Sequence, residues 1–241
     1  MRWHGGPMVG FDTETTGVDV GSDRIVTAAV VHRDASGTRA RTWLVDPGVP
    51  IPEQATAVHG ITTERARADG CAPRVALEEV TAELVAAWRA GIPVVAFNAG
   101  YDLSLLDAEL TRNGLPTVEK RLGRPAGPVI DPLVLDRALD RYRRGKRRLG
   151  DLCALYGVAT PDALHAAHVD VVATLDLLDK VVERFPELKD IDLSTLQAYQ
   201  VHAHLAWAES FNAWRAEQGL LGPGAELDWP VRVQAVVQRA V

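Results

Sequence analysis

The chain has 241 residues, of which 47% are apolar and 24% charged, and its formal net charge is −6. This composition predicts a globular protein with a substantial core and excludes a disordered chain. The net negative charge excludes a polybasic coat protein, whose affinity for nucleic acid depends on overall positive charge. The two cysteines, Cys71 and Cys153, make neither a disulfide framework nor a closely spaced metal-binding pair.

Targeting and membrane signals do not stand out in the sequence. Residues 1–7 are short and glycine-rich, unlike a signal peptide. No run of apolar residues approaches the roughly 20 that a membrane span needs. We therefore expect a soluble, cytoplasmic protein.

The N-terminal third predicts the first strands of a sheet. Met8–Glu14 is expected to be a strand that ends in a Thr-Thr-Gly turn. Ile25–His32 and Arg39–Val45 are rich in β-branched residues and predict a hairpin, so the first three strands form an antiparallel meander. Asp46–Pro73 is interpreted as a long irregular loop, and loops of that length in compact domains are usually functional.

The middle of the chain alternates helical patterns with short apolar runs. Helical spacing predicts helices at Val75–Ala90, Asp102–Asn113, Leu133–Leu139, Arg147–Tyr156 and His168–Phe185. Short apolar runs predict buried strands at Pro93–Phe97 and Val129–Asp131. This order predicts the α/β class, with a mixed five-stranded sheet and helices on both faces.

The pattern changes after Phe185. Ser194 and Gln197 are spaced as a capping box and predict the start of a further helix, which Gly219 ends. One face of this helix is apolar and carries Leu196, Tyr199, Ala203, Trp207, Phe211 and Trp214. We expect a main domain at residues 7–185 and a helical extension at 186–241, which packs on the domain or on a partner subunit.

Two carboxylates stand at the end of the first strand. Asp12 and Glu14 are two residues apart, so both project from the same face of a strand. Carboxylates held side by side repel each other unless a cation lies between them. Hard divalent ions such as Mg²⁺ or Mn²⁺ prefer oxygen ligands, and open α/β sheets bind ligands at the carboxyl ends of strands. The alternative is a pair that simply faces solvent.

Two later segments carry further polar groups of this kind. Asp102 lies at a junction of strand and helix, where it can cap the helix, face a metal site, or do both. His165 precedes Asp170 by five residues, a spacing that fits a histidine before a helix and an aspartate in its first turns. Such a histidine is a candidate general base, with His168 as its rival by position.

Three segments in this order resemble the motifs of the DEDDh 3′→5′ exonuclease family: Phe11–Gly17, Asn98–Asp102 and His165–Asp170. The resemblance covers Met8 to Phe185 and implies an RNase H-like fold, as in the epsilon subunit of bacterial DNA polymerase III, RNase T and oligoribonuclease. It implies two Mg²⁺ ions, for which Mn²⁺ can substitute. The residues implied as metal ligands are Asp12, Glu14, Asp102 and Asp170, with His165 as the general base and all five counted as catalytic.

The resemblance extends to residues around the carboxylates. Val58–Thr62 is similar to a family loop that borders the terminal nucleotide. The substrate-binding residues implied are Thr13, Thr15, His59, Asn98 and Tyr101. Asn98 is also expected to hold its turn by hydrogen bonding to its own backbone. Asp131, at the end of a strand, is interpreted as structural.

Arg141–Arg148 contains six basic residues in eight. Such a run is either a solvated surface segment or a patch that holds the phosphate backbone upstream of the reacting end. The sequence leaves both readings open.

We expect a metal-dependent 3′→5′ exonuclease that releases nucleoside 5′-monophosphates from single-stranded 3′ ends, with DNA favoured. The alternatives are an RNA or oligoribonucleotide exonuclease, a noncatalytic binding module, and a proofreading or assembly subunit of a DNA polymerase. Glu209–Phe211 and Trp229–Arg232 resemble the tail of stand-alone actinobacterial exonuclease-domain proteins. This resemblance favours a free-standing enzyme, able to form a homodimer, over a polymerase subunit.

Overall fold

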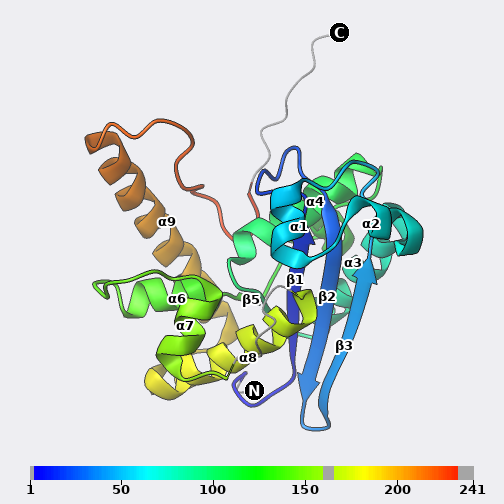
Figure 1. Cartoon of the computed structure of the whole chain (residues 1–241). Coiled ribbons are helices and arrows are strands. Elements are labelled where there is room, and N and C mark those ends of the chain that lie inside the picture. The colour runs from blue at the N-terminus through cyan, green and yellow to red at the C-terminus, as the bar shows by residue number, and fades with distance from the viewer. Residues whose placement is uncertain (1–2, 160–165, 233–241) are drawn as a thin grey trace.

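The computed structural model describes residues 3–159 and 166–232. Its centre is a five-stranded sheet with the order β3-β2-β1-β4-β5. The strands are β1 (Met8–Thr15), β2 (Ile25–Asp34), β3 (Gly37–Leu44), β4 (Val94–Val95) and β5 (Val129–Ile130). The first three are antiparallel, whereas β4 runs parallel to both β1 and β5. The predicted meander and mixed sheet are therefore confirmed (Figure 1).

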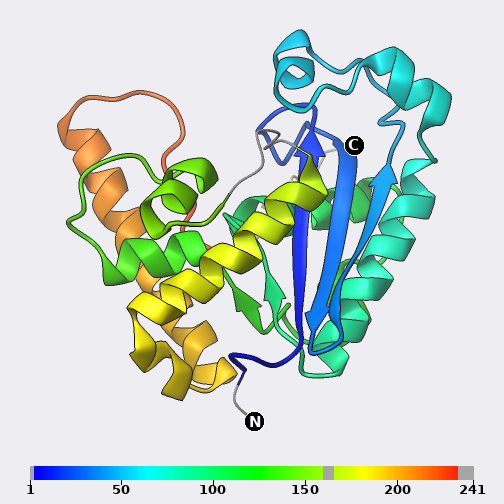
Figure 2. The ribbon, with the colours of Figure 1, turned by 60° about the horizontal axis from the view of Figure 1, so that its bottom comes forward.

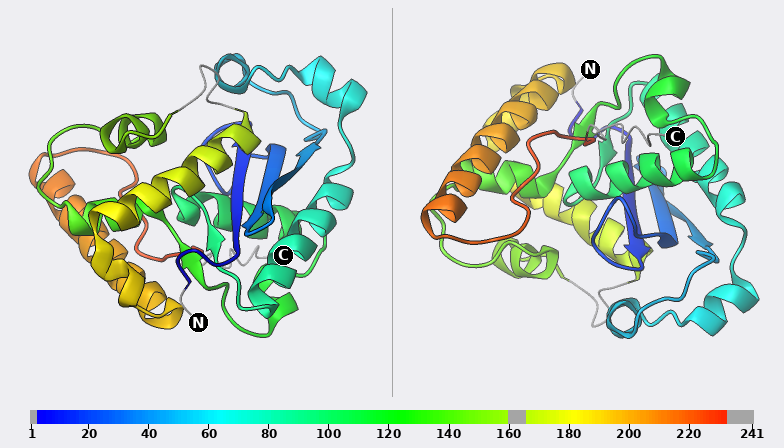
Figure 3. Two further views of the ribbon diagram at one scale, coloured as in Figure 1. Left: turned by 90° about the horizontal axis from the view of Figure 1, so that it is seen from below. Right: turned by 90° about the horizontal axis from the view of Figure 1, so that it is seen from above.

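Helices cover both faces of the sheet, as predicted (Figures 2 and 3). One face packs against α3 (Pro73–Arg89) and α4 (Ala99–Arg112), and the other packs against α8 (Ala167–Arg184). Side chains of β1 alternate between these layers, because successive residues of a strand point to opposite faces. Val9 and Phe11 join the core on the α3 and α4 side. Asp12 and Glu14 consequently point toward α8.

Gly10 lets α8 approach the sheet closely. It lies on the same face of β1 as Asp12, and a Cβ atom added there would lie 2.2 Å from Cγ1 of Val171. Real Cβ atoms do not come that close to another carbon, so any side chain at this position displaces the helix or its buried residues. Val171 directly follows Asp170, so the missing side chain brings that carboxylate to β1.

The expected loop at Asp46–Pro73 is wrong in one respect, because it contains two helices of seven residues, α1 (Glu53–His59) and α2 (Thr63–Asp69). α1 buries none of its residues, and α2 buries only Ala66. Neither helix therefore has the apolar periodicity that identifies a helix in a sequence. Both lie above the end of the β1–β2–β3 sheet in Figure 1.

The remaining helices are α5 (Val118–Leu122), α6 (Pro132–Leu139), α7 (Leu149–Tyr156), the 3₁₀ helix η1 (Pro186–Asp190) and α9 (Leu193–Glu217). α5 contacts α3, whereas α6, α7 and η1 contact α8. α9 is capped by Asp192, whose side chain accepts from the N–H groups of Ser194 and Thr195, so the expected cap at Ser194 is wrong. α9 contacts α6 and β5.

The segment after α9 returns to the main body of the protein. The N–H of Arg232 donates to the Ser104 hydroxyl on α4 at 2.8 Å, and Trp229 packs beside Gly100. In Figure 1 this segment, coloured orange to red, bridges the distance between α9 and α4. Within residues 3–159 and 166–232, no helix combines the length and the apolar character needed to cross a bilayer.

Candidate active site

Three carboxylates converge where β1 meets the first turn of α8. Carboxylate oxygens of Asp12, Glu14 and Asp170 all lie within 4.8 Å of one another. β1 supplies the first two from one face, and the close approach of α8 at Gly10 supplies the third. This spacing allows one cation to contact oxygens of all three residues.

A fourth carboxylate reaches β1 from the opposite side of the sheet. Asp102 is 4% exposed, and its Oδ1 accepts from the Thr13 N–H at 3.1 Å and from the Thr13 hydroxyl at 2.6 Å. Thr13 lies between Asp12 and Glu14, so these two bonds fix Asp102 against the strand that carries the other acids. α4 begins at Ala99, so the reading of Asp102 as its N-cap is wrong.

The start of α4 is held by Asp131. Its carboxylate accepts from the N–H groups of Asn98, Ala99 and Leu133 at 3.1, 2.9 and 2.9 Å. The structural reading of Asp131 is therefore confirmed. Asn98 makes no side-chain capping bond and has φ of 62°, a left-handed conformation that asparagine tolerates. The expected hydrogen bond from its side chain to the backbone is wrong.

Burial and mutual repulsion disfavour the charged forms of these acids. Burial first, and then the neighbouring carboxylates, raise the pKa of Asp12 well above its usual value. The same causes raise the pKa of Glu14 to about 8, and burial raises the pKa of Asp102 to about 7. A bound divalent cation removes this repulsion, so the donor set, made of carboxylate oxygens, fits Mg²⁺ or Mn²⁺.

Two of the expected substrate-binding residues are engaged with each other. The Tyr101 hydroxyl lies 3.0 Å from the Thr15 Oγ1 and 2.5 Å from the Gly17 carbonyl oxygen. The Thr15 hydroxyl also donates to the Gly17 carbonyl at 2.6 Å. Both side chains therefore brace the turn after β1. The hydroxyl of Thr13 is likewise used by Asp102, whereas the exposed Asn98 side chain lines a cavity.

A cavity of about 290 Å³ opens beside Glu14. His59 lines it, with Nδ1 accepting from the Ile61 N–H at 3.1 Å and with Nε2 buried and unpartnered within the described part of the chain. Burial lowers the pKa of His59, so its ring is neutral near pH 7. Arg65 of α2 also lines the cavity, a contact that the sequence reading missed because it placed this residue in a loop.

The candidate general base is not positioned by the structure, because His165 lies outside the described residues. Its rival His168 is exposed and lines the same cavity as Glu14. The geometry therefore leaves the choice between the two histidines open.

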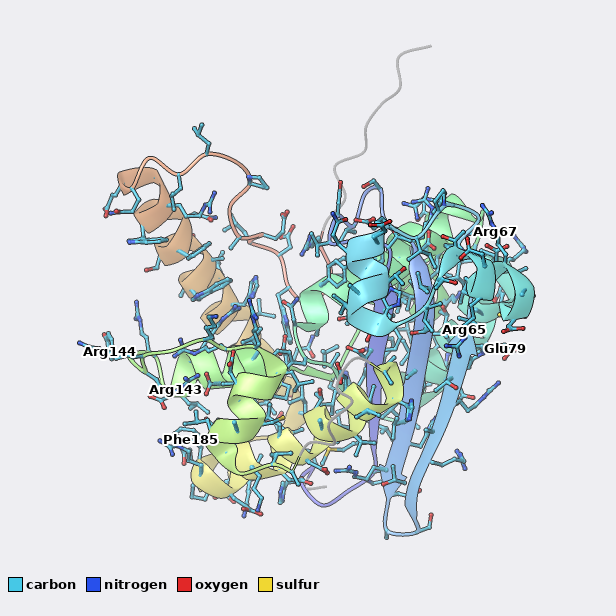
Figure 4. All side chains as sticks on the ribbon, viewed as in Figure 1. Arg65, Arg67, Glu79, Arg143, Arg144 and Phe185 are labelled. Atoms are coloured by element: carbon cyan, nitrogen blue, oxygen red, sulfur yellow. The ribbon has the colours of Figure 1, made fainter. Side chains whose placement is uncertain are left out.

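The basic run is partly committed to the fold. Asp136 of α6 is fully buried, and its Oδ2 accepts from Arg143 at 2.9 Å and from Arg147 at 2.7 Å. Its Oδ1 accepts from the Tyr156 hydroxyl at 3.0 Å. Figure 4 shows Arg143 and Arg144 in the loop between α6 and α7, on the other side of the molecule from Arg65.

Comparisons with known proteins identify the class to which this site belongs. The sequence model of the RNase T exonuclease family matches residues 9–178, which include Asp12, Glu14, Asp102 and Asp170. The chain belongs to this exonuclease family, and its domain is of the DEDD type of 3′→5′ exonucleases, named for four acidic residues.

Two relatives are much longer than this chain. DNA polymerase III PolC-type of Streptococcus thermophilus is 32% identical over 217 residues, which are 88% of this chain and 13% of that protein. A DNA polymerase III subunit epsilon-like protein of Rhodobacter capsulatus is 34% identical over 212 residues, which are 84% of this chain and 27% of that protein. The chain therefore corresponds to a small part of each relative's length.

Solved structures share the fold. Escherichia coli exonuclease I in complex with a dA16 oligonucleotide has a TM-score of 0.65 and 20% identity, over 77% of this chain and 42% of that one. Exonuclease I of Methylocaldum szegediense has a TM-score of 0.63 and 23% identity, over 87% of this chain and 45% of that one.

Proposed function

We propose that this protein is a metal-dependent 3′→5′ exonuclease that releases nucleoside 5′-monophosphates from single-stranded 3′ ends. The observation that carries the proposal is the convergence of Asp12, Glu14 and Asp170 within 4.8 Å. Asp102, fixed by its two bonds from Thr13, adds a fourth carboxylate to the same strand end. A cluster of acids that repel one another is suited to holding cations rather than to standing alone.

Each residue of the site then has a defined task. Asp12, Glu14, Asp102 and Asp170 are the residues that would hold two divalent ions, Mg²⁺ or Mn²⁺. When bound, such ions lower the pKa of water and offset the negative charge of the phosphate. Following the family resemblance, His165 accepts a proton from the attacking water. The water oxygen forms the new bond to phosphorus, the bond to the 3′-oxygen breaks, and that oxygen takes up a proton from solvent.

The cavity beside Glu14 is the place for the terminal nucleotide. It adjoins Glu14, and two side chains that can bind polar groups of a substrate, His59 and Arg65, line it. DNA is the favoured substrate because the structural neighbour was solved with a DNA oligonucleotide, dA16. An RNA exonuclease is the alternative, since discrimination depends on contacts to the 2′-hydroxyl.

The test is digestion of matched single strands of DNA and RNA, each labelled at the 5′ end, with Mg²⁺, with Mn²⁺ and with a chelator. We expect a ladder of products that shorten one nucleotide at a time, only with metal and faster on DNA. The absence of shortening with either metal contradicts the proposal. Faster digestion of RNA instead assigns the enzyme to the oligoribonucleotide class.

A proofreading subunit of a DNA polymerase is a second candidate. It is favoured by two relatives whose names refer to DNA polymerase III. The two candidates differ in their substrates, because a proofreader acts preferentially on a mismatched primer end. Equal digestion of mismatched and matched primer ends by the isolated protein supports the free-standing enzyme, and a clear preference for the mismatched end supports the proofreader.

A further inference from the structure

α9 presents a column of aromatic rings beside α6. Trp207 and Phe211 stack with centroids 5.5 Å apart and planes 16° apart, and Phe211 and Trp214 follow at 5.8 Å and 30°. His204 precedes them at 5.7 Å from Trp207. The sequence predicts that this helix packs on the domain or on a partner subunit, and within the single chain Trp214 is 49% exposed and Trp207 is only partly buried. The column therefore keeps ring surface available to a ligand.

Arg137 of α6 lies over this column with an uncommitted charge. Its guanidinium carbon is 3.7 Å from the centroid of the Trp207 ring. Across the described ranges, no carboxylate forms an ion pair with it. Asp131 and Asp136 influence Arg137 electrostatically, but both bind other groups, because Asp131 accepts backbone N–H groups and Asp136 accepts from Arg143 and Arg147. A partly buried guanidinium without an anion is suited to binding one.

A cavity on one side of the Arg137–Trp207 pair is basic and aromatic. It has a volume of about 310 Å³, and its charged lining residues are Arg137, Arg141 and Arg147, with Tyr199 and Trp207 as its aromatic residues. Among the residues that the structure describes, its lining includes no acid. Its electrostatic character is therefore opposite to that of the carboxylate site and to the chain's net charge of −6.

A second cavity, of about 500 Å³, lies on the other side of the same pair. It runs from Arg137 and Trp207 to Asn98 and Gly100, in the segment that leads into Asp102. Unlike the first cavity it is mixed in charge, because Asp19, Asp131, Glu226 and Asp228 line it together with Arg137 and Arg232. The two cavities together connect the start of α4, next to the catalytic carboxylates, with the basic surface between α6 and α9.

We infer that the basic cavity between α6 and α9 binds the single strand upstream of its 3′ end, with bases stacked on the aromatic column and phosphates at Arg137 and Arg141. The inference rests on the proposed function for the direction of the strand. Rings stack on bases of any sequence, and arginines follow the phosphates, which is how proteins hold single strands without sequence preference. A second copy of this chain is disfavoured as the occupant, because a symmetric contact would place Arg137 and Arg141 against the same arginines of the other copy.

Binding is measured first, without catalysis. The probe is a fluorescent oligothymidylate in chelator, and its anisotropy gives the affinity over a range of salt concentrations. Arg137→Gln and Trp207→Ala should each weaken binding by about fivefold or more, the range set by one stacked base or one charged contact. Arg137→Gln should also reduce the salt slope by about 0.7, the value for one phosphate contact on a single strand. Trp207→Phe keeps a ring and should recover most of the affinity.

Matched controls come from the same region. Arg144→Gln removes a charge, and Tyr142→Ala removes an 88% exposed ring, yet neither residue lines either cavity. Both variants should bind like the parent protein. Losses as large as those of Arg137→Gln and Trp207→Ala overturn the inference, because they indicate a diffuse effect of the basic loop.

Catalysis separates this inference from the proposed function. The p-nitrophenyl ester of thymidine 5′-monophosphate contains a single nucleotide, so in the active site it is too short to contact α9. A long oligothymidylate bound by its 3′ end in the same site extends to α9. For Arg137→Gln, kcat/KM on the long strand relative to the ester should fall at least about fivefold. If the parent protein hydrolyses neither substrate, the proposed function fails, and binding still tests the inference. If Trp207→Ala binds single strands as the parent protein does but converts a dimer of this protein to a monomer, the inference is overturned. The aromatic column then binds a second copy of the chain.

Discussion

Two regions of this protein have opposite chemistry. The carboxylate site is buried, negatively charged and built from β1, α4 and α8, and its acids have raised pKa values. The surface between α6 and α9 is partly exposed, positively charged and aromatic. The first concentrates charge that attracts metal ions, and the second concentrates charge that attracts phosphates. The net charge of the whole chain, −6, therefore predicts the binding properties of neither region, because these depend on the local arrangement of charge.

The largest effect is expected at the negative region. Asp12→Asn removes a proposed metal ligand. Mutation of a residue that only orients a metal ligand typically lowers activity about 10- to 100-fold, so we expect loss of the ligand itself to lower kcat/KM by more than about 100-fold. The same change removes repulsion, so the melting temperature of the metal-free protein should rise. Asp69→Asn, on the exposed end of α2, is the matched control and should change neither quantity. Near-normal turnover of Asp12→Asn contradicts the position of the metal site.

The packing that brings the acids together can be broken at Gly10. Gly10→Val forces a side chain against Val171 and should lower the free energy of unfolding by about 3 kcal/mol, as overpacking of a core does. The folded fraction of the variant should also be less active than the parent protein, because Asp170 moves away from β1. Denaturant unfolding and single-turnover rates measure the two effects. Gly21→Ala is the control, since an added Cβ there lies 3.3 Å from its nearest atom. Equal stability of both variants contradicts the close approach of α8.

The loop that borders the basic surface between α6 and α9 is held in place by the buried Asp136. Asp136→Asn removes the charge that holds Arg143 and Arg147, and should cost about 2 kcal/mol of stability, as loss of charged hydrogen bonds does. Affinity for single strands should change in the opposite direction from that of Arg137→Gln, since two guanidinium groups become available. Thermal melts and anisotropy measure both. Weakened strand binding by folded Asp136→Asn shows that the position of these arginines matters more than their charge.

The smallest effect is a pH dependence of the metal-free protein. Because the pKa of Glu14 rises from 4.5 to about 8 on folding, the folded state binds its proton more tightly than the unfolded state. This contribution to stability is fully present below pH 4.5 and is lost as the pH rises through about 8. Added Mg²⁺ or Mn²⁺ should therefore raise the melting temperature more near pH 8 than near pH 4.5. A metal-induced shift independent of pH contradicts this reading.

The sheet and two of the acids could be predicted because their signals are local. Alternation along β1 places Asp12 and Glu14 on one face, and the β-branched runs identify the hairpin. The bond from Thr13 to Asp102 joins residues 89 positions apart, and no local pattern reports it. The helices α1 and α2 were missed because they bury almost nothing.

The surface between α6 and α9 could not be predicted from the sequence, for a different reason. The apolar spacing of Trp207, Phe211 and Trp214 indicates an amphipathic helix, but spacing does not say how much of that face a partner covers. α6 ends at Leu139 and covers only part of it. The basic run gives no sign that a buried aspartate binds two of its arginines, since Asp136 precedes them on α6 and they lie in the loop that follows.

The absence of a side chain at Gly10 also bears on which ion the protein selects. Mg²⁺ requires oxygen ligands at about 2.0–2.1 Å in near-octahedral order, whereas Ca²⁺ accepts about 2.3–2.6 Å and irregular geometry. The separation between α8 and β1 fixes how far Asp170 lies from Asp12, and the atom missing at position 10 sets that separation. In the proposed metal site, the packed layer beneath Asp12 and Asp170 would set which ionic radius fits, and Gly10→Ala should shift the preference toward larger ions without altering an oxygen donor.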